Sequence, residues 1–379
     1  MKNFNLIFLS LTLFLFGCSK SIIKLDLTSR DEVIPMFGKI PERNFVYPEV
    51  GEIDTLTEKW EYELTGSFNS TSISVFENYG FVNDLSGRVY CINLNTGKGS
   101  GVIKLKNPIM GTPILNKNIL IYVETFGDEN KSILTFYDFE NGKLKDNAQI
   151  KGRILNEILK VYNAIVLVTE NGIAYKYDLN GIKIWETKIE SFVHSSPAAN
   201  DELMVFGDDK GEVVGVELST GRIRFKNKTG SSFFSGTTIS ENKFYIADDK
   251  GIVYCFNLID GKEIWKYNTG SKISTFPIVY DDAVYIGNLS GTFYKISSEG
   301  KLIWKTNTMG VLNSTPLLAG NNLIVPDMDE KFYLVNAKDG KIKNTYTTET
   351  RIRISPIIYK NMLIIGIDRG VVKAYEISK

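Results

Sequence analysis

The chain has 379 residues, which is enough for one large domain or two ordinary ones. Acidic and basic residues balance at 44 each, so the composition gives no electrostatic reason to expect nucleic acid or an acidic surface as a partner. Aromatic residues are plentiful, proline is scarce and long amphipathic helical patterns are absent. These features indicate an all-β protein.

The first residues have the features of a targeting segment. Lys2 supplies a positive charge, residues 6–16 are apolar, and Leu-Phe-Gly-Cys at residues 15–18 is similar to a bacterial lipobox. We therefore predict a lipoprotein signal peptide at residues 1–17 and lipidation of Cys18. A plain signal peptide or a membrane anchor is the alternative, but the apolar run is shorter than the ~20 residues that span a bilayer. Ser19, not Asp, follows the cysteine, which by the same resemblance favours sorting to the outer membrane.

Residues 18–57 are predicted to form a flexible tether that carries the lipid. This stretch has mixed charge, three prolines (Pro35, Pro41 and Pro48) and no sustained hydrophobic period. We expect much of it to be mobile, with some residues docking on the body. Deletion of residues 20–50 is accordingly expected to leave the melting temperature nearly unchanged.

A repeat begins at Glu58 and continues to the end of the chain. Each unit reads as strand, tight turn and strand, and the turn glycine adopts the positive φ that such hairpins require. Successive turn glycines lie 39 to 45 residues apart, at Gly97, Gly142, Gly181, Gly221, Gly261, Gly300 and Gly340. A period near 40 with four short strands per unit is typical of a β-propeller.

The two ends of the repeat region predict how the ring closes. The last unit has only three strands, at residues 352–359, 362–367 and 371–377. Residues 60–64 match the outer strands that begin at Trp265 and Trp304. We therefore predict an eight-bladed propeller at residues 58–379, in which an N-terminal strand completes the last blade and removes an open sheet edge.

All four tryptophans and two cysteines fall in repeated positions. Trp60, Trp185, Trp265 and Trp304 occupy one position of the outer strand, where we expect their large side chains to pack between neighbouring blades. Cys91 and Cys255 share another position and lie 164 residues apart, about four repeats. In a ring of eight they would face each other across the molecule, so we interpret them as buried free thiols.

The run Asp-Gly-Lys-Glu-Ile-Trp at residues 260–265 resembles the tryptophan-docking repeat of pyrroloquinoline-quinone propellers. A lipobox followed by eight such repeats resembles the BamB family of outer-membrane assembly lipoproteins. This resemblance covers residues 58–379. It implies a non-catalytic scaffold without a cofactor, a monomeric propeller within the β-barrel assembly machinery, held by a lipid on the periplasmic face of the outer membrane.

The resemblance also implies where a partner would bind. The family's contact is an inter-blade loop of Leu-x-Leu-Arg-Gly type before a blade's first strand, with an Asp-x-Asp pair one blade on. The matching stretches here are residues 190–194 and 233–236, in which the Arg and the two Asp are missing. The candidate partner-binding residues are Phe192, Val193, His194, Phe233 and Phe234. Ordinary loop packing is the alternative role for these side chains.

The sequence gives weaker support to an enzyme or to a metal site. A quinone-dependent dehydrogenase would resemble this repeat, but such enzymes use Ca²⁺ ligands, a catalytic Asp and usually adjacent cysteines, and none of the three cysteines here is adjacent to another. His194 is the single histidine, beside Ser195, which is weak support for a catalytic triad. Asp327, Asp329 and Glu330 favour a solvated turn over a Ca²⁺ site. A scaffold for another cell-envelope complex remains the second scaffold hypothesis.

Overall fold

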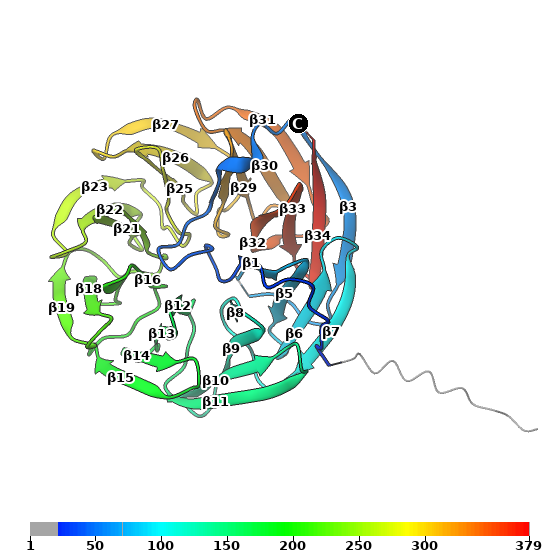
Figure 1. Cartoon of the computed structure of the whole chain (residues 1–379). Coiled ribbons are helices and arrows are strands. Elements are labelled where there is room, and N and C mark those ends of the chain that lie inside the picture. Colours follow the sequence, from blue (N-terminus) through cyan, green and yellow to red (C-terminus); the bar gives the residue numbers. More distant parts are fainter. Residues whose placement is uncertain (1–21, 70, 379) are drawn as a thin grey trace, which may run out of the picture.

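The computed structural model describes residues 22–69 and 71–378, which form a closed ring of eight β-sheets around a central axis (Figure 1). Each sheet is one blade of four antiparallel strands, and the sheets of blades 1 and 7 each gain a fifth short strand from the N-terminal segment. The first strand of a blade lies nearest the axis and the fourth lies at the rim. The prediction of an all-β, eight-bladed propeller with four-stranded blades is confirmed.

Blades 1 to 4 follow one another in chain order. Blade 1 contains β4 (Ser74–Phe76), β5 (Tyr79–Asp84), β6 (Arg88–Asn93) and β7 (Lys98–Lys104); blade 2 contains β8 (Ile114–Asn116), β9 (Ile119–Phe126), β10 (Lys131–Asp138) and β11 (Lys143–Lys151). Blade 3 contains β12 (Leu159–Val161), β13 (Ala164–Val168), β14 (Ile173–Asp178) and β15 (Lys183–Lys188); blade 4 contains β16 (Ala198–Ala199), β17 (Leu203–Gly207), β18 (Glu212–Glu217) and β19 (Ile223–Lys228).

Blades 5 to 8 complete the ring. Blade 5 contains β20 (Thr238–Ser240), β21 (Lys243–Ala247), β22 (Ile252–Asn257) and β23 (Glu263–Asn268); blade 6 contains β24 (Ile278–Tyr280), β25 (Ala283–Gly287), β26 (Thr292–Ser297) and β27 (Leu302–Asn307). Blade 7 contains β28 (Leu317–Ala319), β29 (Asn322–Pro326), β30 (Lys331–Asn336) and β31 (Ile342–Thr347); blade 8 contains β32 (Ile352–Tyr359), β33 (Met362–Ile367), β34 (Val371–Ser378) and the N-terminal β3 (Thr55–Glu63).

The hairpin between β22 and β23 shows why the repeat folds as it does. The second and third strands of each blade are largely buried on both faces, because neighbouring blades pack against them. The Asn257 carboxamide oxygen accepts a hydrogen bond from the backbone N–H of Ile259 at 2.8 Å, and Gly261 adopts a φ of 66°. A side-chain-capped turn with a glycine in the left-handed region therefore reverses the chain.

Strand β3 closes the ring as the sequence predicted. It pairs antiparallel with β34, and Trp60 lies opposite Ala374. The strand begins at Thr55, three residues before the predicted start of the repeats. Lys373 of β34 is buried, and its Nζ lies 2.9 Å from a Glu58 oxygen of β3 and 2.8 Å from a Glu349 oxygen. The first and last strands of the propeller are thus joined by this lysine and by an antiparallel ladder with one bulge between Glu58 and Trp60.

The four tryptophans all bind the following blade. Each indole N–H donates to a backbone carbonyl near the turn between the third and fourth strands of that blade, so each ring lies between two neighbouring sheets. The four pairs are Trp60 with Leu94 at 3.0 Å, Trp185 with Leu218 at 3.0 Å, Trp265 with Ser298 at 2.8 Å, and Trp304 with Ala337 at 3.3 Å. In blade 4 Phe225 takes the tryptophan position and packs on Gly261 of blade 5.

The expectation of a flexible tether is corrected for residues 22–57, which pack on the propeller. Short strands β1 (Glu32–Ile34) and β2 (Val46–Tyr47) pair with the first strands of blades 1 and 7, and a 3₁₀ turn follows at Pro48–Val50. Figure 1 shows this dark blue segment crossing the ring near the axis before it returns to the rim as β3. The physical reason is that it carries apolar residues that reach the core of the ring: Ile23, Leu25, Met36, Phe37, Phe45 and Val46.

Of the three cysteines, Cys91 and Cys255 lie among the residues that the structure describes, and Cys18 does not. Cys91 and Cys255 are buried free thiols, as predicted, and lie in blades 1 and 5. The signal peptide at residues 1–17 and the lipidated Cys18 fall outside the described residues. Within the described ranges, no helix has the length and apolar character needed to cross a bilayer.

Candidate functional site: the open face of the propeller

The antiparallel order of the strands gives the disc two different faces. On one face, which we call the plugged face, residues 28–50 run across the turns between first and second strands; for example, Glu77 donates its N–H to the carbonyl of Asp31 at 2.9 Å and Gly320 donates to Tyr47 at 3.0 Å. The other face, the open face, carries the loops that lead from one blade to the next. The partner loops predicted from the sequence, residues 190–194 and 233–236, lie on the open face.

Arg43 fills the axis of the ring from the plugged side. Its side chain is 0% exposed, and its guanidinium donates to the carbonyl oxygens of Phe37 at 2.8 Å and Pro197 at 3.1 Å. Burial lowers the pKa of Arg43 to about 10, and the nearby Glu157 carboxylate acts in the opposite direction. Burial likewise raises the pKa of Glu157, an effect that Arg43 opposes. The two buried groups therefore partly compensate each other's charge.

Aromatic rings surround this arginine. The rings of Phe37 and Phe276 have centroids 4.9 Å apart, Phe45 lies 5.2 Å from Phe37, and Arg43 lies against both Phe37 and Phe276. A cavity of about 160 Å³ remains on the open side of this cluster, and His194 and Phe234 are among its lining residues. The centre of the ring is thus occupied by the chain's own side chains, with a small polar cavity at the mouth of the open face.

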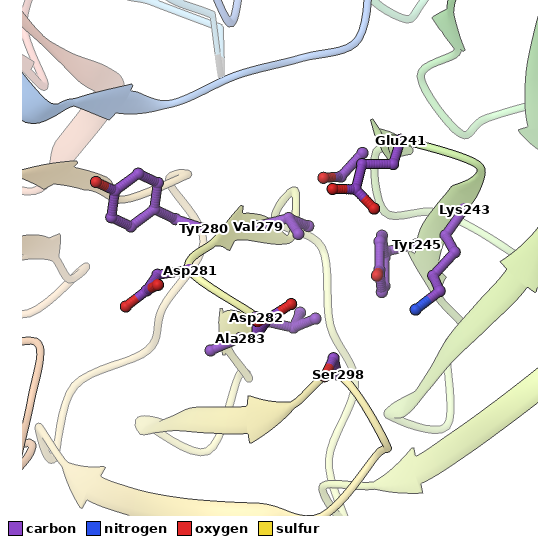
Figure 2. A pocket seen from close by; sticks show the side chains of 11 residues that line it. Glu241, Lys243, Tyr245, Val279, Tyr280, Asp281, Asp282, Ala283 and Ser298 are labelled. Atoms are coloured by element: carbon purple, nitrogen blue, oxygen red, sulfur yellow. The ribbon is translucent and has the colours of Figure 1, made fainter.

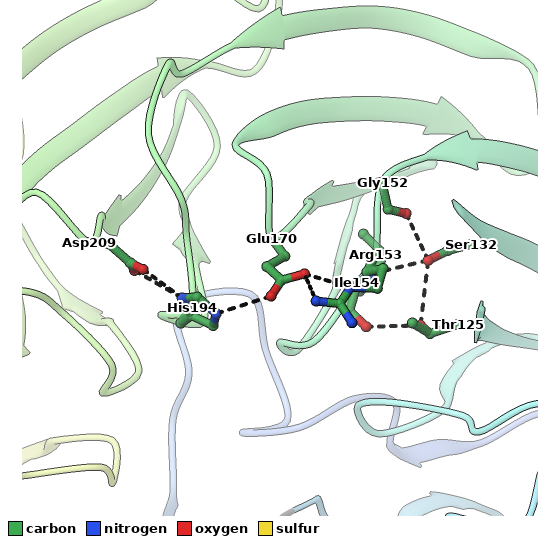
Figure 3. Close-up of polar contacts among 8 residues, drawn as sticks. All are labelled: Thr125, Ser132, Gly152, Arg153, Ile154, Glu170, His194 and Asp209. Carbon is green, nitrogen blue, oxygen red and sulfur yellow. Dashed lines mark hydrogen bonds and ion pairs between the residues drawn. The ribbon is translucent and has the colours of Figure 1, made fainter. Parts of the chain in front are cut away.

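His194 is the centre of a polar row on the open face (Figure 3). Its Nδ1 lies 2.8 Å from an Asp209 oxygen, and its Nε2 lies 3.4 Å from a Glu170 oxygen. Glu170 in turn accepts a hydrogen bond from Nε of Arg153 at 2.7 Å. Glu170 contacts Arg153 on one side and His194 on the other, and His194 also contacts Asp209. The row therefore joins loops of blades 3 and 4 and fixes their relative positions.

The structure separates the five predicted partner residues. Phe192 is 59% exposed and points into solvent, whereas His194 and Phe234 are half-buried, with ring centroids 5.5 Å apart. Val193 and Phe233 are fully buried, in the cores between blades 3 and 4 and between blades 4 and 5. The prediction that these two contact a partner is corrected, since alternation along each loop turns one apolar side chain inward and the next outward.

Backbone hydrogen bonds hold the loop that presents Phe192. The carbonyl of Phe192 accepts from Asp209 at 2.9 Å, and Val193 donates to Glu170 at 2.9 Å. Lys272, one blade further on, places its Nζ 4.6 Å from the ring centroid of Phe234. An exposed aromatic ring on a fixed loop, next to a half-buried aromatic and a cation, is a composition typical of protein-binding surfaces.

Sequence reasoning missed Arg43, Arg153, Glu170 and Asp209. Asp209 stood in a turn pattern, where Asp is common whatever its contacts, and only the distance to His194 gives it a second role. One feature of the sequence could have indicated the role of Arg43. It lies between apolar residues, which are unusual in a flexible linker.

Neither Ser195 beside His194 nor the turn at Asp327 has the geometry of a catalytic triad or of a Ca²⁺ site. Ser195 is buried and its hydroxyl donates to the carbonyl of Gly207 at 2.6 Å, away from His194. Asp327 accepts hydrogen bonds from the backbone of Asp329 at 2.9 Å and Lys331 at 3.0 Å, as a turn residue does. Over residues 22–69 and 71–378, no group of three or more His, Cys, Asp or Glu is arranged to hold a metal ion.

A second depression of about 290 Å³ lies on the plugged face between blades 5 and 6 (Figure 2). Glu241, Asp281 and Asp282 belong to its two turns and all three have positive φ values, of 53°, 49° and 54°. Lys243 and Tyr245 line one side, and burial raises the pKa of the Tyr245 hydroxyl. The depression is lined mainly by turn residues, and its three carboxylates give it a negative character.

The ring is built from repeats of about 40 residues, one per blade, and tryptophans pack between the blades. These features define a β-propeller of the quinone-repeat class. Three solved structures share the fold: BamB from Moraxella catarrhalis (TM-score 0.72, 17% identity, 85% of this chain and 100% of that chain), quinohemoprotein alcohol dehydrogenase from Comamonas testosteroni (0.72, 11%, 92% and 81%), and a europium-containing methanol dehydrogenase (0.73, 12%, 90% and 91%). At these identities the likeness concerns the fold alone.

Within that class, the chain belongs to the family of the outer membrane protein assembly factor BamB. The model of this family matches residues 134–243, 169–273, 226–299 and 249–379. A curated relative, the outer membrane protein assembly factor BamB of Shewanella oneidensis, is 29% identical over 213 residues, or 52% of this chain and 53% of the relative. The match therefore spans about half the length of that relative.

Proposed function

We propose that this protein is a non-catalytic scaffold lipoprotein of outer-membrane β-barrel protein assembly. Cys18 carries the lipid anchor, and the propeller lies on the periplasmic side of the outer membrane. The observation that carries the proposal is Phe192, an exposed aromatic on a hydrogen-bonded loop of the open face, at the position that matches the family's contact loop. Membership of the BamB family supports the assembly role.

The proposed contact surface consists of Phe192, His194 and Phe234, with Lys272 at its edge. Phe192 can enter an apolar pocket of a partner with little loss of entropy, because its loop is already held by the hydrogen bonds of Asp209 and Val193. The half-buried His194 and Phe234 form the floor beside it. This surface replaces the Arg and Asp pair of the family's contact with aromatic and basic groups.

The dehydrogenase hypothesis is less well supported by the same structure. Its fold neighbours include quinone enzymes, but the axis here is filled by Arg43, Phe37 and Phe45, and the remaining cavity of about 160 Å³ is small for a tricyclic quinone with a substrate. A scaffold for another cell-envelope complex stays the second candidate, because the open face differs from the family pattern at the contact residues.

The test is affinity capture of the full-length protein from its own solubilised membranes, with identification of the co-purifying proteins. The proposal expects a barrel-insertion subunit in near-equal amount. Replacing Phe192 and Phe234 by Ala is expected to lower its recovery about tenfold or more, as for central aromatic contacts. Ile303→Ala is the matched control, since Ile303 is also about half exposed (51%) but lies on the rim of blade 6.

Two other results would change the assignment. Recovery of a different envelope complex, with the same loss in the Phe192 variant, would support the second scaffold hypothesis and overturn the role in barrel assembly. Recovery that is equal in the wild type, the double variant and Ile303→Ala would remove the open face as the contact surface.

A further inference from the structure

The N-terminal segment is held in the groove between the rims of blades 1 and 2. Ile23 is fully buried, and its carbonyl accepts a hydrogen bond from the Tyr137 hydroxyl at 2.8 Å. Leu25 is also buried and donates its N–H to Phe139 at 2.8 Å. Gly101 leaves room for the passing backbone, because a Cβ there would lie 2.8 Å from Cα of Ile23. The segment therefore starts from a fixed point on the rim.

This fixed point lies close in sequence to the predicted lipid anchor. Three residues lie between Cys18 and Ile22, so four residue steps join them, and an extended chain of that length reaches at most about 14 Å. A lipidated Cys18 would therefore hold the rim of blades 1 and 2 within about 14 Å of the lipid headgroups. A long flexible tether would leave the orientation open, whereas this short one selects one edge of the disc.

The surface around the fixed point has the charge expected of an edge that meets anionic lipid. The outer strands β7 and β11 carry five exposed lysines and one aspartate, namely Lys98, Lys104, Lys143, Lys145, Lys151 and Asp146. Among the described residues, no carboxylate lies within 4.0 Å of any of the five ammonium groups. Two exposed apolar side chains accompany them, Ile22 at 64% and Leu144 at 54%.

The neighbouring rim strand has the opposite charge. Strand β3 of blade 8 presents Glu58, Glu61 and Glu63 with a single lysine, Lys59. The basic residues of β19 are partly neutralised, since Arg224 contacts Glu217 at 3.4 Å and Lys226 contacts Glu212 at 3.0 Å. The rim of blades 1 and 2 thus combines five lysines that have no described carboxylate within 4.0 Å with a position next to the anchor point.

We propose that this rim, formed by β7, β11 and residues 22–25, rests on an anionic lipid surface and holds the propeller edge-on. The inference depends on the lipid anchor of the proposed function. Lysines near an anionic bilayer attract it electrostatically, and Ile22 and Leu144 add apolar contact at the headgroup boundary. In this orientation both faces of the disc stand clear of the membrane, so the open face with Phe192 is accessible to a protein partner.

The first test uses the mature chain with Cys18→Ser, which has no acyl chain, and vesicles of phosphatidylethanolamine with phosphatidylglycerol. The triple variant Lys143→Gln, Leu144→Ser and Lys145→Gln is expected to lower the partition coefficient roughly tenfold or more. The matched control is Lys301→Gln, Ile303→Ser and Lys305→Gln, which removes two lysines and one exposed apolar side chain at and just before β27 of blade 6 and is expected to change partition less than about twofold. Equal losses in both variants, or no loss in either, would overturn the proposal.

The second test uses the lipidated protein in the same vesicles and compares amine acetylation with that of the Cys18→Ser form in solution. Lys143 and Lys145 are expected to react several-fold more slowly on the vesicles, while Lys301 and Lys305 react at unchanged rates. Slower reaction at blade 6, or unchanged rates at both edges, contradicts the edge-on placement. Mass spectrometry that finds no acyl chain on Cys18 overturns it as well, whereas partner capture through Phe192 tests the scaffold role independently.

Discussion

Leu25 donates its backbone N–H to the carbonyl of Phe139 at 2.8 Å, at the turn position that accepts a tryptophan indole in other blades. Blade 1 has Gly101 in the tryptophan position, and the groove between blades 1 and 2 would otherwise be open. The N-terminal segment therefore takes the place of the missing tryptophan. Ile23 and Leu25 fill the groove, and the Leu25 N–H makes the hydrogen bond that the indole makes elsewhere. This substitution explains why a segment without any repeat pattern is fixed on the ring.

A substitution of Gly101 tests this arrangement. In Gly101→Ala the new Cβ would lie 2.8 Å from Cα of Ile23, at a φ of 149° that favours glycine. We expect release of the segment and a loss of about 1–3 kcal/mol in the free energy of unfolding. Urea denaturation and hydrogen exchange at the Leu25 amide measure the two effects. Gly127→Ala is the control, because nothing lies within 4 Å of its added Cβ.

Removal of Arg43 is expected to destabilise the whole ring. Arg43→Ala leaves buried carbonyls of Phe37 and Pro197 without donors and removes the charge that opposes the burial of Glu157. The expected cost is about 3–5 kcal/mol in guanidinium unfolding, against under about 0.5 kcal/mol for Arg351→Ala at an exposed site. A loss in the free energy of unfolding no larger than that of Arg351→Ala would contradict the view that Arg43 anchors residues 28–50 on the ring.

The same geometry reverses one expectation drawn from the sequence. Deletion of residues 20–50 should not leave the melting temperature nearly unchanged, because it removes Arg43 together with the buried Phe37 and Phe45. We expect a marked fall in the melting temperature, measured by differential scanning calorimetry. A deletion that ends at residue 21 is the control, since it leaves every described contact of the segment in place.

The tryptophan positions should not be equivalent. The indole of Trp265 is buried and its hydrogen bond to Ser298 is 2.8 Å long, whereas Trp304 is half-buried with a bond of 3.3 Å to Ala337. Phenylalanine is native at this position in blade 4, so replacement by Phe keeps the packing and removes the bond. We expect Trp265→Phe to cost about 1 kcal/mol and Trp304→Phe less. The reverse order in equilibrium unfolding would contradict this ranking.

The two buried thiols should be unreactive in the native state. Burial raises the pKa of Cys255 to about 11, so at pH 8 only about 0.1% is thiolate, and burial also raises the pKa of Cys91. Because both pKa values are raised above the unfolded value, the folded state keeps its proton longer, and stability falls as pH rises above about 8.5. In the Cys18→Ser form, Ellman's reagent is expected to react with two thiols only in denaturant. Rapid reaction of the native protein at pH 8 would contradict their burial.

The sequence alone predicted what is local and repeated: strands, glycine turns, a period near 40, and hence eight blades with Trp60, Trp185, Trp265 and Trp304 in one position. Closure by β3 followed from the same repeat, because its strand matched the outer strand that the last unit lacks. Only the tertiary structure decided the rest. Arg43 meets Pro197 across a separation of 154 residues, and His194 meets Asp209 because the loop that enters blade 4 lies beside the turn between β17 and β18.

The exposed Phe192 and the buried Val193 are adjacent and both apolar, and no local pattern says which one turns outward. The path of residues 22–50 depends in the same way on grooves and carbonyls that exist only after the blades have assembled. A repeat can be recognised from sequence because each unit contains the same short-range interactions. A docked segment and a contact surface are determined by residues that are distant in the chain, and the closed ring alone brings them together.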